Sequence, residues 1–127
     1  MRALKSRAEI EAGITTNNAF PRGERVVVYE PGDGTRITLL FLDLSSIPSG
    51  AARDLGFIPN ATLVLWANPV RSPARKPSTM VSPSQTKVSL RKVRQELGCS
   101  LDDALPVAEV IGYVMGMDVQ GAPAAKS

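Results

Sequence analysis

The chain has 127 residues, 43% of them hydrophobic, which suffices for one packed domain without cross-links. It contains one cysteine and no histidine, and these counts exclude an intrachain disulfide, Ser-His and Cys-His catalytic pairs and the common zinc sites. The formal net charge is +3, and the acidic residues form no calcium-loop pattern. We therefore expect a protein that is not an enzyme and that uses no cofactor and no metal.

The N-terminal residues do not have the pattern of a signal peptide. Basic residues at the start are followed by Glu9 and Glu11, where such a peptide needs an apolar run. Elsewhere, no apolar run approaches the roughly 20 residues that a membrane-spanning helix requires. The sequence thus predicts a cytoplasmic protein without a membrane partner.

The first 24 residues are predicted to form a short helix and a loop. Good helix formers over residues 2–12 indicate a helix that ends at Gly13. Residues 14–23 are rich in threonine and asparagine and include Pro21, so we expect a loop in which these side chains compete for backbone hydrogen bonds.

Residues 25–70 are predicted to form the β-sheet core. A β-branched run from Val26 and an apolar run over residues 35–44 indicate an antiparallel hairpin. The second run is apolar on both alternating sets, which predicts a strand that is covered on both faces. Residues 45–57 allow one helical turn or an irregular crossover, and residues 62–68 form a third strand that Pro69 stops.

After the sheet, residues 71–88 form a basic loop, rich in proline and serine, whose composition favours extended backbone. Helices then fill residues 89–118. Ser89 can cap a short helix that Gly98 ends, and Ser100 marks a second helical start. Residues 119–127 are mostly small, which predicts a flexible tail.

The last predicted helix contains two features of its own. Pro106 is expected to set the first turn of a longer helix that reaches about Met117. Gly112 and Gly116 have the spacing of a close helix approach, and in this chain we favour core packing over dimerisation as its reason.

These elements predict an α+β fold. A small antiparallel sheet of about three strands, residues 25–68, is packed by C-terminal helices, residues 89–117. The exposed edge of such a sheet leaves pairing with a second copy of the chain open, so a homo-oligomer is one expected state.

Charge is distributed unevenly along the chain. Residues 55–95 include no acidic residue and seven basic ones: Arg71, Arg75, Lys76, Lys87, Arg91, Lys92 and Arg94. Several cations on one surface attract nucleic acid, because neutralising phosphates releases counterions. No aromatic residue lies between Trp66 and Tyr113, which favours contacts with a duplex backbone over base stacking. We therefore predict a non-enzymatic regulatory or accessory protein that binds nucleic acid through these seven residues.

Three other interpretations stay open. A protein-protein interaction module, such as an adaptor, inhibitor or assembly subunit, would dock the same basic segment on an acidic partner. The basic residues could instead do no more than keep an extended loop solvated. Residues 93–104 also allow a helix-turn-helix, but Arg94, the Asp102–Asp103 pair and Pro106 are unfavourable for that motif.

Overall fold

The computed structural model of the chain describes residues 2–19, 24–32, 34–67 and 79–123. Its elements in chain order are α1 (Arg7–Gly13), β1 (Ile14–Ala19), β2 (Glu24–Tyr29), β3 (Ile37–Asp43), the short 3-10 helix η2 (Leu44–Ser46), α2 (Ser49–Asp54), β4 (Thr62–Ala67), β5 (Thr79–Val81), β6 (Lys87–Ser89), α3 (Leu90–Leu97), α4 (Leu101–Met115) and β7 (Asp118–Gln120).

Strands β1 to β5 form one antiparallel sheet in which each strand pairs with its neighbours in the sequence. Val27 of β2 lies opposite Leu39 of β3, and Phe41 of β3 lies opposite Val64 of β4. This register sets β-branched, aliphatic and aromatic residues in cross-strand pairs, the contacts that stabilise a pleated sheet. A second, two-stranded sheet joins β6 and β7 in parallel.

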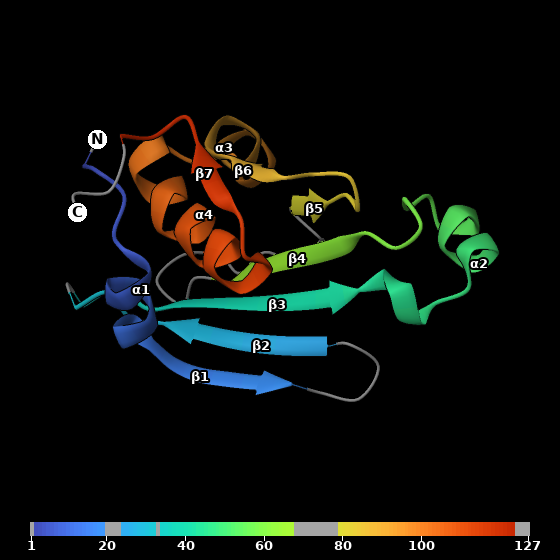
Figure 1. Ribbon diagram of the computed structural model, residues 1–127, viewed down its shortest axis with the longest axis horizontal. Helices are drawn as coiled ribbons and strands as arrows, with labels where there is room; N and C mark the ends of the chain where they lie inside the picture. The colour runs from blue at the N-terminus through green and yellow to red at the C-terminus, as the bar shows by residue number, and fades with distance from the viewer. Residues whose placement is uncertain (1, 20–23, 33, 68–78, 124–127) are drawn as a thin grey trace.

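Helix α4 lies across one face of the five-stranded sheet and forms the centre of the core (Figure 1). Val27, Leu39 and Phe41 are buried in the same cluster as Val107 and Ile111 of the helix. Fully burying a side chain of this kind contributes about 1.5–3 kcal/mol. The packing of the sheet against α4 is therefore a large contribution to the stability of the domain.

The other face of β3 is less completely covered. Its alternate residues Thr38, Leu40 and Leu42 are only partly buried. The prediction that this strand is covered on both faces is thus correct for one face and only partly correct for the other.

The connection between β3 and β4 projects from the end of the sheet opposite α1 (Figure 1). It contains η2 and α2 and is held by a small separate cluster of Leu44, Ala61 and Leu63. Beyond this cluster, Leu55 is 67% and Ile58 is 46% exposed. The projecting end therefore presents apolar side chains to solvent.

The α+β fold predicted from the sequence is confirmed, with its antiparallel sheet and its mainly C-terminal helices. The hairpin of β2 and β3 and the third strand β4 occur where the sequence predicts them. None of the helices in the described part of the chain combines the length and apolar character that a bilayer crossing requires.

The predicted loop over residues 14–23 is wrong for its first six residues, which form the edge strand β1. Thr16 to Ala19 pair with Val28 to Arg25. The backbone of β2 offers a full row of hydrogen-bonding groups, and pairing with them outweighs the local preferences of threonine and asparagine. Polar residues are also tolerated at an edge strand, because one side of it faces solvent.

Three further short strands lie in segments that the sequence predicts as loop or tail. Thr79–Val81 forms β5 and adds an edge to the sheet beside β4, and Lys87–Ser89 forms β6. Residues 118–120, partly within the predicted tail, form β7, whose Val119 packs against the main core. Each strand follows from a long-range backbone pairing, which local composition does not reveal.

Two predictions about α4 have different outcomes. Pro106 does not open the helix, which begins at Leu101 under a cap from Ser100 and continues through the proline. The core-packing interpretation holds for Gly112, where a Cβ atom would lie 2.7 Å from the Met117 carbonyl oxygen. It is wrong for Gly116, which is exposed and ends the helix with a φ of 69°. Gly112 therefore allows the chain to turn back closely against α4 and enter β7.

Helix α1 begins later than predicted, at Arg7, because Ser6 forms a capping box with Glu9. The pKa of Glu9 is lowered chiefly by the hydrogen bond that its carboxylate accepts from the Ser6 backbone N–H, and next by the bond from the Ser6 hydroxyl. A lowered folded-state pKa means that the contact stabilises the helix above the unfolded pKa. The stabilisation is lost as pH falls through the folded value.

We expect the pKa of Glu9 to rise toward its ordinary value in a Ser6→Ala variant, because one of its two hydrogen bonds is lost. An NMR titration of the Glu9 side-chain carboxyl measures this directly in both proteins. Equal Glu9 pKa values would show that the Ser6 hydroxyl makes no such bond in solution.

Candidate nucleic-acid interface

Helix α3 presents five exposed polar or charged side chains, three of which are predicted basic residues. Ser89 begins the helix by accepting a hydrogen bond from the Lys92 backbone N–H at 3.3 Å, and Gly98 ends it with a φ of 64°. Leu90 and Val93 are buried against the core, so the remaining side of the helix faces outward. The exposed residues on it are Arg91, Lys92, Arg94, Gln95 and Glu96.

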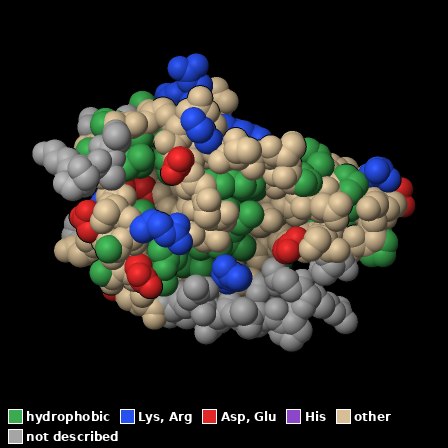
Figure 2. All heavy atoms as spheres, in the orientation of Figure 1, with side chains coloured by type: hydrophobic (Ala, Val, Ile, Leu, Met, Phe, Trp, Pro, Cys, Tyr) green, Lys and Arg blue, Asp and Glu red, His purple; other side chains and the backbone are tan. Residues whose placement is uncertain are grey.

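The four described basic residues form no ion pair with any residue in the described ranges. These are Lys87, Arg91, Lys92 and Arg94. Figure 2 shows Lys and Arg side chains gathered at the upper edge of the view, over α3. A solvated group of cations of this kind is available to a polyanion.

Acidic neighbours reduce the charge near two of these four residues. Glu96 follows Lys92 by four positions on the helix, where side chains are neighbours. In the parallel ladder of β6 and β7, Lys87 lies opposite Asp118. Arg91 and Arg94, three positions apart, are therefore the strongest part of the candidate interface.

The other three predicted site residues, Arg71, Arg75 and Lys76, lie outside the described residues. The structure thus describes four of the seven predicted residues, one on β6 and three on the helix that directly follows it. The role of all seven in binding stays a prediction.

The helix-turn-helix interpretation does not fit the packing of α4. A recognition helix must enter the major groove with its own side chains. In α4, the residues from Ala104 to Gly112 are buried except for Pro106, and Asp102 in the exposed first turn would face phosphates. This helix is the core of the domain, so it cannot be a reading element.

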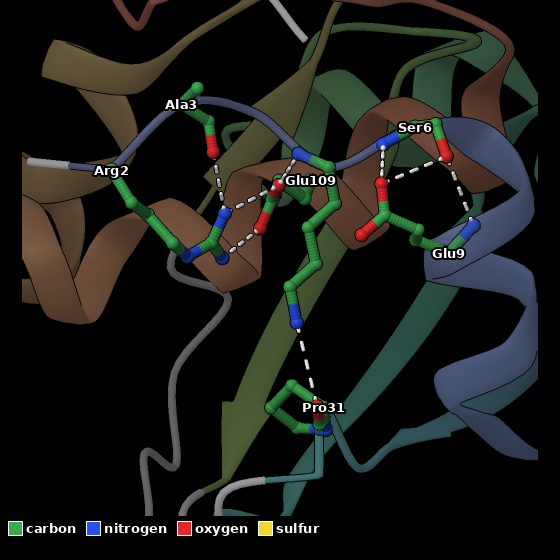
Figure 3. A network of polar contacts seen from close by, with 7 residues as sticks. Arg2, Ala3, Ser6, Glu9, Pro31 and Glu109 are labelled. Carbon is green, nitrogen blue, oxygen red and sulfur yellow. Dashed lines mark hydrogen bonds and ion pairs between the residues drawn. The ribbon is translucent and has the colours of Figure 1, made fainter. Parts of the chain in front are cut away.

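An ion pair that was not predicted from the sequence joins the buried Glu109 of α4 to the partly exposed Arg2 of the N-terminal segment (Figure 3). The side chain of Glu109 is 0% exposed and its carboxylate accepts hydrogen bonds from both terminal nitrogens of Arg2. Oε2 also accepts from the Lys5 backbone N–H at 2.6 Å. A buried carboxylate needs such partners, because desolvation strongly disfavours an unpaired charge.

A sequence signal for this pair exists in the position of Glu109. It is an acid within the apolar run Val107-Ala108-Glu109-Val110-Ile111, which predicts a buried charge on a core helix. No sequence feature identifies Arg2 as its partner.

A cavity of about 500 Å³ lies beside this ion pair. Its walls come from the N-terminal segment and α1, from the C-terminal half of α4, and from the residues around β7. The guanidinium of Arg7 lies 4.4 Å from the centre of the Tyr113 ring at this cavity. None of the residues that line it belongs to α3.

Within the described part of the chain, no three cysteine, aspartate or glutamate side chains come together as a metal site would require. Comparisons with protein-family models, with curated proteins and with solved structures give no match.

Proposed function

We propose that this chain is a non-enzymatic, cytoplasmic regulatory or accessory protein that binds nucleic acid through phosphate contacts. The observation that supports this most is the exposed face of α3, where Arg91 and Arg94 have no acidic partner among the described residues. Arginine is suited to such contacts, because its planar guanidinium can bind phosphate oxygens in a bidentate manner.

The geometry of α3 favours contact with the backbone of a duplex over reading of its bases. Helix α3 has eight residues and is thus only about 12 Å long, and its buried side is fixed against the core. Such a helix can rest on a duplex but brings few side chains to base edges. Phosphate contacts give affinity and register without sequence information. The proposed partner is therefore a duplex that is bound with little sequence preference, with Arg71, Arg75 and Lys76 as additional contacts.

The test is a salt titration with a fluorescein-labelled 20-base-pair DNA duplex, followed by fluorescence anisotropy. If Arg91 and Arg94 each neutralise one phosphate, the slope of log affinity against log salt becomes shallower by about two units in an Arg91→Ala/Arg94→Ala variant. Affinity at low salt falls accordingly.

The matched control is Arg36→Ala/Arg53→Ala, which removes the same net charge from two exposed arginines outside α3. It is expected to retain the wild-type slope. Equal losses of duplex affinity in both double variants would show that net charge alone drives binding. If the wild-type protein does not bind the duplex at 50 mM salt, the proposal is excluded.

A protein-protein interaction module is the second candidate, and a separate observation favours it. Leu55 and Ile58 are large apolar side chains exposed at the projecting end of the molecule. Large apolar side chains exposed on a projecting segment are available for an apolar contact with a partner. Recovery of one stoichiometric acidic protein on co-purification, together with weak duplex binding, would favour this function over nucleic-acid binding.

A further inference from the structure

The cavity beside the Arg2–Glu109 pair has the size and lining of a small-molecule site. Its volume of about 500 Å³ lies within the range of roughly 300–1,000 Å³ that ligand pockets occupy. Ile10, Tyr113, Val119 and Ala122 supply much of its apolar wall. An apolar wall with a few charged groups at one side is the usual composition of such pockets.

The charged groups that line the cavity differ in how free they are to bind a ligand. Glu109 lines it, but its two oxygens already accept hydrogen bonds from Arg2 and from the Lys5 backbone. The other acid of the lining, Asp118, is exposed and lies opposite Lys87 in the ladder of β6 and β7. Neither carboxylate is placed to attract a cationic ligand strongly.

The two cations of the lining, Lys5 and Arg7, keep most of their donors free for a ligand. The Lys5 ammonium donates to the Pro31 carbonyl oxygen at 3.4 Å, and Arg7 donates to the Tyr113 carbonyl oxygen at 3.4 Å. Both are long contacts, and these groups have three and five N–H donors in total. Neither forms an ion pair with a described residue.

We propose that this cavity binds a small anionic amphiphile, a carboxylate with an apolar body. The head group pairs with Lys5 and Arg7, and the apolar body lies against Ile10, Tyr113, Val119 and Ala122. The site shares no residue with the α3 face, so it is a second binding function and does not depend on the one proposed above.

The experiment uses the full chain and decanoate as the probe, with decyltrimethylammonium as a probe of similar apolar length and opposite charge. Isothermal titration gives the affinity of each. Changes in the backbone amide NMR chemical shifts on addition of each probe locate its binding site. We expect decanoate to bind more tightly than the cation, with shifts concentrated in residues 4–10 and 113–122.

Two variants test the parts of the site separately. Lys5→Gln/Arg7→Gln is expected to raise the Kd of decanoate about tenfold, since two charge-assisted contacts are lost while the Lys5 backbone bond to Glu109 is kept. Ala122→Phe is expected to abolish binding by filling the cavity. Should the phenylalanine variant fail to fold, the Lys5→Gln/Arg7→Gln variant still tests the site.

The control is Arg91→Gln/Arg94→Gln on α3, which removes the same charge and is expected to bind decanoate as the wild type does. Because this variant is also expected to lose duplex affinity, the two proposals can fail independently. Equal affinity for both probes, shifts spread over other surfaces, or unchanged decanoate binding in Lys5→Gln/Arg7→Gln would overturn the site.

Discussion

An Arg2→Met variant is expected to lose about 2–4 kcal/mol of unfolding free energy, because it leaves the buried Glu109 carboxylate without its guanidinium partner. Methionine keeps much of the apolar stem of arginine, so the loss reports on charge more than on packing. The side chain of Arg2 is 41% exposed, and water that reaches Glu109 after the substitution keeps the effect below the upper end of the usual range. Urea denaturation followed by circular dichroism measures this loss of unfolding free energy.

The double variant Arg2→Met/Glu109→Leu is the informative companion to this experiment. Removing both charges leaves no unpaired carboxylate, so most of the lost stability is expected to return. The exposed ion pair of Arg36 and Glu30, whose Nε and Oε1 atoms lie 3.8 Å apart, supplies a matched control. Arg36→Met is expected to change stability by less than about 1 kcal/mol. Similar effects of Arg2→Met and Arg36→Met would contradict the assigned role of Glu109.

A Gly112→Ala variant is expected to be destabilised by about 2 kcal/mol, although alanine is the better helix former. Its Cβ atom would lie 2.7 Å from the Met117 carbonyl oxygen and 3.3 Å from a methyl group of Val119. The first of these is backbone that cannot rotate away, so the turn into β7 must shift. Thermal unfolding by circular dichroism detects the loss.

Gly50→Ala is the matched control for this substitution, because Gly50 is also helical but a Cβ atom there would meet no neighbour within 4 Å. It is expected to leave stability unchanged or to raise it by up to about 1 kcal/mol. If the two variants behaved alike, the close approach at Gly112 would not be present in solution.

Local chemistry explains why the C-terminal helices could be predicted. Ser89, Gly98 and Ser100 are capping residues whose effect depends on the few residues beside them, and each caps a helix end in the structure. The strong strands β2 to β4 are equally local, since they consist of β-branched and apolar residues.

Segments whose structure depends on a distant partner were not predictable in this way. Strand β1 carries turn-forming residues and is a strand only because β2 is available to pair with it. Pro106 is a helix breaker by local rules, yet the capped start at Ser100 and the burial of the helix carry α4 through it.

The two candidate sites differ in the same way, because one depends on residues close together in the chain and the other on residues far apart. The basic face of α3 is visible in the sequence because its charges are close together in the chain. Arg2 and Glu109 are 107 positions apart, and the cavity beside them is formed by the two ends of the described chain. Only the packed structure brings these groups together.

The order of the elements along the chain bears on how the protein folds during synthesis. Strands β1 to β5 leave the ribosome before α4, so the apolar face of the sheet, with Val27, Leu39 and Phe41, has no cover while synthesis proceeds. Glu109 likewise becomes available to Arg2 only after all five strands of the sheet have emerged. The domain therefore reaches its stable state late, and its strands are exposed to chaperones, and to pairing with other nascent chains, until α4 docks.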